Sequence, residues 1–82
     1  MNFKPDIDLR GERGEAAIGI IQTFIDEAIM FEVGHLRILH GKGNGILRQI
    51  TRDYLRSVKE VKKYQDAPLE QGGAGITIIN FK

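Results

Sequence analysis

Glycines at alternating positions stand next to the residues that carry the most chemistry in this sequence. Residues 40–48 read HGKGNGILR, in which a histidine precedes the glycines and a lysine lies between two of them. Glycine takes positive φ easily and lets the backbone come close to another molecule. A loop of this kind between a strand and a helix exposes backbone N–H groups at the positive end of the helix dipole. The segment therefore predicts a phosphate-binding loop formed by Gly41, Lys42, Gly43, Asn44 and Gly45.

This loop matches neither common nucleotide-binding motif. A Walker-type loop continues from lysine to serine or threonine, whereas Lys42 is followed by Gly43 and Asn44. The dinucleotide motif fails as well, because Ile46 and Arg48 stand near the place of its last glycine. Two readings remain open: backbone amides that hold a phosphate of a polymer together with Lys42, or a tight connection that only needs glycines. We favour the first.

Three further residues could act with this loop. An imidazole at His40 can serve as a general acid or base near neutral pH, or it can hydrogen-bond the adjoining loop, and the spacing leaves both readings open. Arg10, beside Gly11, can bind a phosphate through two hydrogen bonds or form an ion pair with Asp8 or Glu12. Asp8 can orient Arg10 or His40, or hold a divalent cation. The candidate catalytic residues are Asp8, Arg10, His40 and Lys42.

Hydrophobic spacing predicts the elements that must position these residues. Alternating or β-branched segments predict strands at 6–10, 35–39, 61–66 and 76–81. Apolar residues three and four apart predict helices at 12–33, with Gly34 as its stop, and at 46–58, with Asn44 as its cap. Residues 68–75 are expected to form a loop. The order is βαβαββ.

The strand–helix–strand order predicts where the candidate residues meet. Such a unit implies parallel strands joined by a right-handed crossover. Parallel strands that each lead into a helix end at the same edge of the sheet. The connection at Arg10 and Gly11 and the loop at 40–45 should therefore lie side by side.

Charge is distributed unevenly along a chain whose net charge is only +1. Residues 1–34 carry 3 basic and 7 acidic side chains, a balance of −4, and residues 35–66 carry 8 basic and 3 acidic side chains, a balance of +5. On the second helix Arg48, Arg52 and Arg56 recur every four residues and form a basic ridge. The ridge predicts salt-sensitive binding of a nucleic-acid backbone with little sequence preference; the alternative is an ordinary solvated face.

Composition excludes several classes of protein. The chain of 82 residues has no cysteine, so it can form neither a disulfide framework nor a thiolate zinc site, and its 2 histidines are far apart. No apolar run is long enough to span a membrane, and residues 1–9 lack the layout of a signal peptide. We expect one domain, in the cytoplasm, without membrane contact.

Four segments together resemble a known family. IDLRG at 7–11, HGKGNGILR at 40–48, the pair Tyr54-Leu55 and GGAGITIINF at 72–81 resemble the Smr (small MutS-related) domain along nearly the whole chain. The resemblance is greatest to the Smr domain at the C-terminus of the bacterial second-type MutS paralogue. We therefore expect a single Smr domain over 1–82, the C-terminal fragment of a longer MutS-family protein. The family's motifs fall on Asp8, Leu9, Arg10 and Gly11 and on His40, Gly41, Lys42 and Gly43, with Asn44 in place of the usual threonine.

The resemblance implies both a fold and an activity. The fold is α/β, a two-layer α+β sandwich with two helices on a mixed four-stranded sheet, similar to the C-terminal domain of translation initiation factor three. The implied activity is nucleic-acid binding with endonuclease cleavage. Members of the family nick DNA in the MutS-paralogue context, and some eukaryotic relatives cleave RNA. The parent it resembles is a homodimer that is associated with suppression of homologous recombination and with collided ribosomes, and its ATPase lies outside this domain.

Two hypotheses follow for this chain. In the first, the loop amides, Lys42 and Arg10 hold the scissile phosphate, His40 transfers a proton, and Asp8 orients Arg10 or His40 or holds a cation, Mg²⁺ or Mn²⁺. In the second, the chain is a non-catalytic module that docks the parent ATPase on branched or duplex DNA or on ribosomal RNA.

Overall fold

The computed structural model describes residues 3–82, and its elements follow the predicted βαβαββ order. The first two residues of the domain expected over 1–82 lie outside this range. None of the helices in the described part of the chain is both long and apolar enough to cross a membrane. The elements are β1 (Asp6–Asp8), α1 (Gly14–Met30), β2 (His35–Leu39), α2 (Ile46–Leu55), β3 (Val61–Asp66), the short 3₁₀ helices η1 (Leu69–Gln71) and η2 (Gly73–Gly75), and β4 (Ile76–Phe81).

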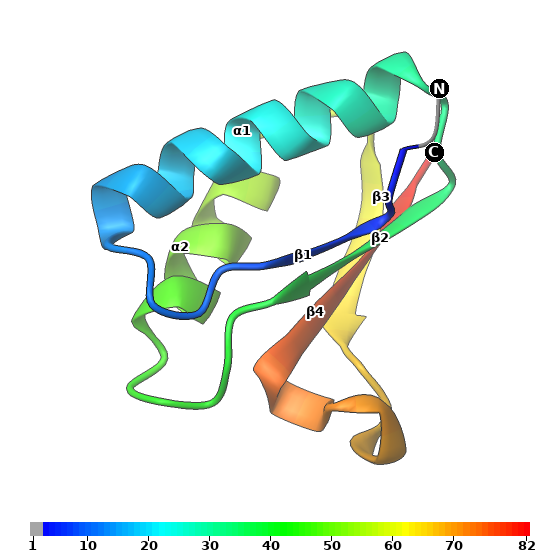
Figure 1. Ribbon diagram of the computed structural model, residues 1–82. Helices are drawn as coiled ribbons and strands as arrows, with labels where there is room; N and C mark the ends of the chain where they lie inside the picture. The colour runs from blue at the N-terminus through cyan, green and yellow to red at the C-terminus, as the bar shows by residue number, and fades with distance from the viewer. Residues whose placement is uncertain (1–2) are drawn as a thin grey trace.

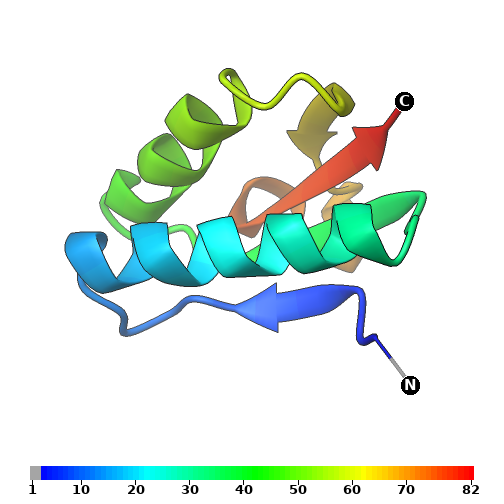
Figure 2. The ribbon, with the colours of Figure 1, turned by 90° about the horizontal axis from the view of Figure 1, so that it is seen from above.

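The strands form one mixed sheet in the order β1-β2-β4-β3. β1 pairs with β2 in parallel, with Ile7 opposite Ile38. The last strand, β4, lies between β2 and β3 and runs antiparallel to both. Both helices lie on the same face of the sheet and contact each other (Figures 1 and 2). The predicted fold class, two helices packed on a mixed four-stranded sheet, is confirmed.

The core lies between the helices and the sheet, where alternation along the strands and helical spacing place the apolar side chains. From α1 the buried residues recur every three or four positions. The central strands contribute side chains with no exposed surface. Across residues 3–82, the large aliphatic side chains that are fully buried are Leu9, Ile21, Ile25, Leu36, Ile38, Leu55 and Ile79.

The first helix is shorter at both ends than its spacing predicted. It begins at Gly14 and ends at Met30. The chain then turns through Glu32, whose φ of 56° is left-handed, and the N–H of Val33 donates to the Ala28 carbonyl oxygen at 3.0 Å. This bond pattern is a Schellman motif, with Glu32 in the position that glycine usually occupies. The prediction of Gly34 as the helix stop is wrong.

Two other boundaries also differ from prediction. β1 ends at Asp8, because the Asp8 carboxylate accepts the backbone N–H of Arg10 at 2.9 Å and turns the chain out of the sheet. α2 ends at Leu55 instead of residue 58, and the N–H of Ser57 bonds the Tyr54 carbonyl oxygen at 3.0 Å in a tighter turn.

Truncation of Ile79 should test the position of the core. This side chain has no exposed surface and sits in the central strand opposite Leu36 and Tyr64. Ile79→Ala should lower the free energy of unfolding by about 2–5 kcal/mol, from lost apolar burial and the cavity left behind. Met30→Ala, at a side chain 72% exposed on α1, should change it by less than about 0.5 kcal/mol. Urea denaturation of both variants measures the difference, and equal effects would contradict the placement of Ile79 in the core.

Candidate functional site

The connection after β1 and the glycine loop after β2 meet, as the parallel order predicted. Together they line a pocket of about 410 Å³, whose walls include Arg10, Gly11, residues 40–45 and Leu47. Figure 1 shows the two connections side by side at the end of the sheet away from the C-terminus. Contact is close, because a Cβ on Gly41 would lie 3.4 Å from Arg10 Cγ. Arg10, Gly11, His40 and Lys42 thus share one site.

The loop backbone presents unused hydrogen-bond donors to its surroundings. Gly41 and Gly45 take φ values of 81° and 80°, which glycine allows without strain. The N–H groups of His40 and Gly41 both donate to the Gly75 carbonyl oxygen at 3.0 Å. Within residues 3–82 the N–H groups that follow have no hydrogen-bond partner; they belong to Lys42, Gly43, Asn44 and Gly45. Consecutive free amides at the positive end of a helix suit an anion.

The side chain of Asn44 caps the second helix from the residue that precedes the N-cap. Gly45 occupies the N-cap position of α2. The Asn44 Oδ1 atom accepts the N–H of Ile46 at 3.1 Å. A short polar side chain at this position therefore stabilises the start of the helix while leaving the neighbouring loop amides free.

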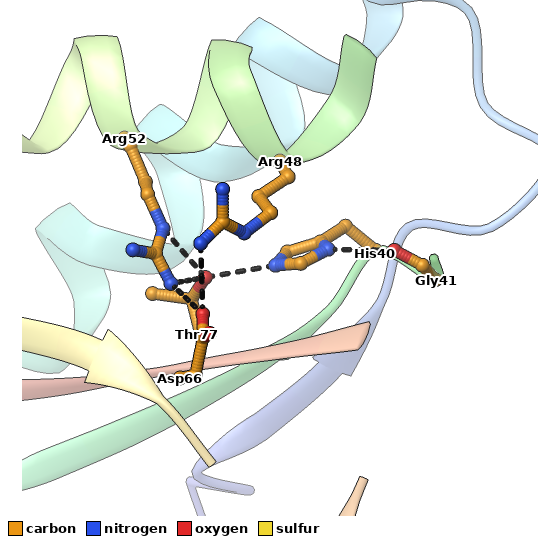
Figure 3. A network of polar contacts seen from close by, with 6 residues as sticks. All are labelled: His40, Gly41, Arg48, Arg52, Asp66 and Thr77. Atoms are coloured by element: carbon orange, nitrogen blue, oxygen red, sulfur yellow. Dashed lines mark hydrogen bonds and ion pairs between the residues drawn. The ribbon is translucent and has the colours of Figure 1, made fainter. Parts of the chain in front are cut away.

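His40 is buried and uses both of its ring nitrogens inside the protein (Figure 3). Nδ1 lies 3.0 Å from the Gly41 carbonyl oxygen, and Nε2 lies 2.8 Å from Thr77 Oγ1. Burial lowers the pKa of the imidazole; the Gly41 carbonyl bond raises it, and the nearby charges of Arg52 and Arg48 lower it further. The hydrogen bond to the loop, one of the two readings of the sequence, is observed, and a catalytic role for His40 stays a prediction.

Asp8 orients Arg10 and not His40. Arg10 donates through Nε to Asp8 Oδ1 at 3.1 Å and through Nη2 to Asp8 Oδ2 at 2.9 Å. These side-chain bonds, and the one from the Arg10 backbone, hold the pKa of the Asp8 carboxyl below its usual range. Asp8 itself lines a neighbouring pocket of about 310 Å³ with Asp6 and Arg37, so it reaches the loop pocket only through Arg10. A cluster of three or more metal-ligating His, Asp or Glu side chains is absent from the described residues, and a cation at Asp8 stays an untested prediction.

The predicted basic ridge is largely paired with carboxylates. Arg48 and Arg52 both bond Asp66 Oδ1, at 3.0 and 2.6 Å, and Arg56 pairs with Asp53. Hydrogen bonds from Arg48, together with the charges of both arginines, lower the pKa of Asp66. One carboxylate between two guanidinium groups leaves a net positive charge, so the ridge stays attractive to phosphates but is weaker than its sequence suggested.

Sequence reasoning missed Thr77, the fully buried residue at the centre of this network. A signal was present in the strand at 76–81. Thr77 and Ile79 share one face of that strand, and Ile79 belongs to the core. A threonine at a core-facing position needs a hydrogen-bond partner, which could have pointed to His40 or to an arginine of α2.

The fold and the pocket define a two-layer α+β domain with a glycine loop at one end of its sheet, and comparison with known proteins agrees with this fold. A family model described as the Smr domain matches residues 7–82. The chain belongs to the Smr domain family.

Several relatives of known name are similar to this chain. It is 43% identical over 81 residues to Endonuclease MutS2 of Latilactobacillus sakei, and 44% identical over 81 residues to Endonuclease MutS2 of Finegoldia magna. Each match covers 99% of this chain but 10% of the relative, so the chain spans about a tenth of the length of these proteins.

Solved structures show the same fold. The crystal structure of the Smr domain of Thermus thermophilus MutS2 superposes with a TM-score of 0.90 at 38% identity, covering 96% of this chain and 99% of that one. YdaL, a stand-alone small MutS-related protein from Escherichia coli, has a TM-score of 0.90 at 23% identity over 95% of this chain and 64% of its own, and supports the fold alone.

The buried state of His40 should appear in the pH dependence of stability. Because the folded state holds the pKa of His40 below its usual 6.5, the unfolded state takes up the proton first as the pH falls. The free energy of unfolding contributed by this residue should be constant above the unfolded pKa and decline as the pH falls through 6.5 toward the folded pKa. Urea denaturation from about pH 8 to about pH 5 measures this decline.

His40→Gln provides the comparison, because glutamine cannot take up a proton in this range. The difference in free energy of unfolding between the wild-type chain and this variant should shrink as the pH falls. A difference that stays constant would contradict the lowered pKa.

Proposed function

We propose that this chain binds the phosphate backbone of nucleic acid in the pocket between Arg10 and the glycine loop, and that it cleaves a phosphodiester bond there. The observation that carries the proposal is the row of free backbone N–H groups from Lys42 to Gly45, residues that line one pocket together with Arg10. Backbone amides, a lysine and an arginine are the groups that bind and stabilise phosphate charge.

The proposed roles follow from the geometry of each group. The amides and Lys42 hold the phosphate, and their fixed positions favour the extra negative charge of the transition state. Arg10 reaches the same phosphate while Asp8 sets its orientation through the paired bonds. Proton transfer by His40 would require one of its ring nitrogens to leave Gly41 or Thr77 when substrate binds. The basic ridge of Arg48, Arg52 and Arg56 would guide the rest of the polymer.

A second function, docking without cleavage, is favoured by the engagement of His40. Both ring nitrogens are occupied by protein groups, so the imidazole is set up to hold the loop. Phosphate binding itself needs no proton transfer. In this case the chain would place a longer MutS-type protein on branched or duplex DNA or on ribosomal RNA, a proposal supported by the small share of the relatives that it spans.

The two functions share a prediction about salt. Lys42→Ala should weaken binding to a duplex oligonucleotide and lower the slope of log affinity against log salt by about 0.9, because one phosphate contact is lost. Lys4→Ala removes the same charge just before β1, at the strand end away from the pocket. Its slope should equal that of the wild-type chain within experimental error. Fluorescence anisotropy at several salt concentrations measures both. Equal slopes for the two variants would remove Lys42 from the binding site.

Cleavage separates the two functions. The chain should nick supercoiled plasmid or cut a structured RNA in the presence of magnesium or manganese, and Arg10→Gln should slow the reaction by about tenfold or more through loss of transition-state contacts. Lys4→Ala, prepared in the same way, should keep full activity, so a loss confined to Arg10→Gln assigns the cleavage to this chain and not to a contaminating nuclease. A lane with chelator shows whether a metal takes part, and a higher metal concentration required by Asp8→Asn would then indicate that Asp8 holds it. Intact salt-sensitive binding with no cleavage under any of these conditions would leave the docking function.

A further inference from the structure

A buried chain of hydrogen bonds links the second helix to the glycine loop through Thr77 (Figure 3). Thr77 Oγ1 lies 3.3 Å from Arg52 Nε, 3.2 Å from Arg52 Nη2 and 2.8 Å from His40 Nε2. On the other side of the ring, His40 Nδ1 lies 3.0 Å from the Gly41 carbonyl oxygen. Thr77 has no exposed surface and His40 is 5% exposed, so water does not replace these bonds.

With a neutral imidazole, only one arrangement of protons satisfies this chain. A guanidinium group donates and never accepts, so Thr77 Oγ1 is the acceptor from Arg52. A carbonyl oxygen only accepts, so His40 Nδ1 carries the proton. In a neutral imidazole the remaining ring nitrogen, Nε2, carries no proton, so it accepts from the Thr77 hydroxyl. The direction of donation is Arg52 to Thr77 to His40 to Gly41, and it selects the Nδ1–H tautomer of a neutral imidazole.

This direction fixes the orientation of the peptide between Gly41 and Lys42. In a trans peptide the C=O and N–H bonds point in opposite directions. Because the Gly41 carbonyl is held against the buried imidazole, the N–H of Lys42 points away from it. That N–H is the first of the loop donors that have no partner within the described chain.

We propose that Thr77 and His40 are positioning residues that hold the Gly41–Lys42 peptide with its N–H directed at the bound phosphate. The proposal rests on phosphate binding at this loop. It gives His40 a role that does not require it to touch substrate, and it gives the same phosphate site a contribution from the strand β4. The hydroxyl of Thr77 is the group on which the arrangement depends, because it alone supplies the proton that Nε2 accepts.

Three variants separate the effect of the Thr77 hydroxyl group from the effect of the size of its side chain. Thr77→Val keeps the shape of the side chain and removes the hydroxyl, and Thr77→Ser keeps the hydroxyl. Thr51→Val is the matched control, because Thr51 is also fully buried and its hydroxyl bonds the Leu47 carbonyl oxygen at 2.8 Å within α2 and bonds neither His40 nor the loop at 41–45. All three are compared with the wild-type chain.

The first readout is the tautomer of His40, from long-range nitrogen–proton NMR spectra of the imidazole. Wild-type and Thr77→Ser should give the Nδ1–H pattern, and Thr77→Val should give a mixture or the other tautomer. The second readout is the shift of the Lys42 amide signal during titration with inorganic phosphate, together with affinity for a duplex oligonucleotide. Thr77→Val should lose the amide shift and bind about tenfold more weakly, as expected for loss of one hydrogen bond to a charged group. Thr77→Ser and Thr51→Val should bind within about twofold of wild type.

Several outcomes would overturn the proposal. The Nε2–H tautomer in the wild-type chain would do so even if Thr77→Val failed to fold. An unchanged tautomer in folded Thr77→Val would do so too, as would wild-type affinity despite a changed tautomer. Equal weakening by Thr51→Val would mean that any buried hydroxyl matters equally. If the wild-type chain bound neither phosphate nor oligonucleotide, the proposed function would fail, and the tautomer spectra would still decide whether Thr77 and His40 hold the loop peptide.

Discussion

The parallel pairing of β1 with β2 is the constraint on which the site depends. The last hydrogen bond of this pairing runs from the N–H of Leu9 to the Leu39 carbonyl oxygen at 2.8 Å, at the point where both strands end. Leu9 is fully buried, which anchors the first strand at the point where it ends. Arg10 directly follows Leu9 and His40 directly follows Leu39 in the sequence, so both residues line the pocket at the same edge of the sheet. Without this pairing, Arg10 and the glycine loop would not be held at the same edge of the sheet.

The antiparallel β4 supplies the third support of the site. The Gly75 carbonyl oxygen, just before this strand, accepts the N–H groups of both His40 and Gly41, and Thr77 within it bonds His40. A Cβ on Gly75 would lie 3.4 Å from Lys42 Cγ and 3.6 Å from the Gly41 carbonyl carbon, so even a methyl group would fill the remaining space. The loop is therefore held from the sheet side while its amides beyond Gly41 stay free, which is the preorganised arrangement that anion binding favours.

The two-layer fold was implied by the resemblance to the Smr domain. Periodicity and topology rules were sufficient for the element order and the meeting of the two connections, because these depend on local patterns and on the handedness of the crossover. They were insufficient where a single hydrogen bond decides, as at Glu32, which ends α1 in a left-handed conformation without glycine. Thr77 and Asp66 escaped notice because their partners depend on β4 lying between β2 and β3. No local pattern encodes that insertion, and the same insertion decides that His40 is buried.

The charges around the pocket differ in how readily they can exchange partners. Arg52 has a side chain only 18% exposed, donates to Asp66 and Thr77 and lies over the Tyr64 ring, so taking it away breaks a packed network. Arg10 and Asp8 are 62% and 50% exposed, and exposed pairs contribute little to stability because water screens them. Little stability is therefore at stake when Arg10 meets a charged group at the pocket, and Nη1, which makes no bond to Asp8, is the donor it can offer while Asp8 keeps the guanidinium oriented. Arg52, in contrast, ties α2 to β3 and β4 through Asp66 and Thr77, so its donors are already occupied by the structure.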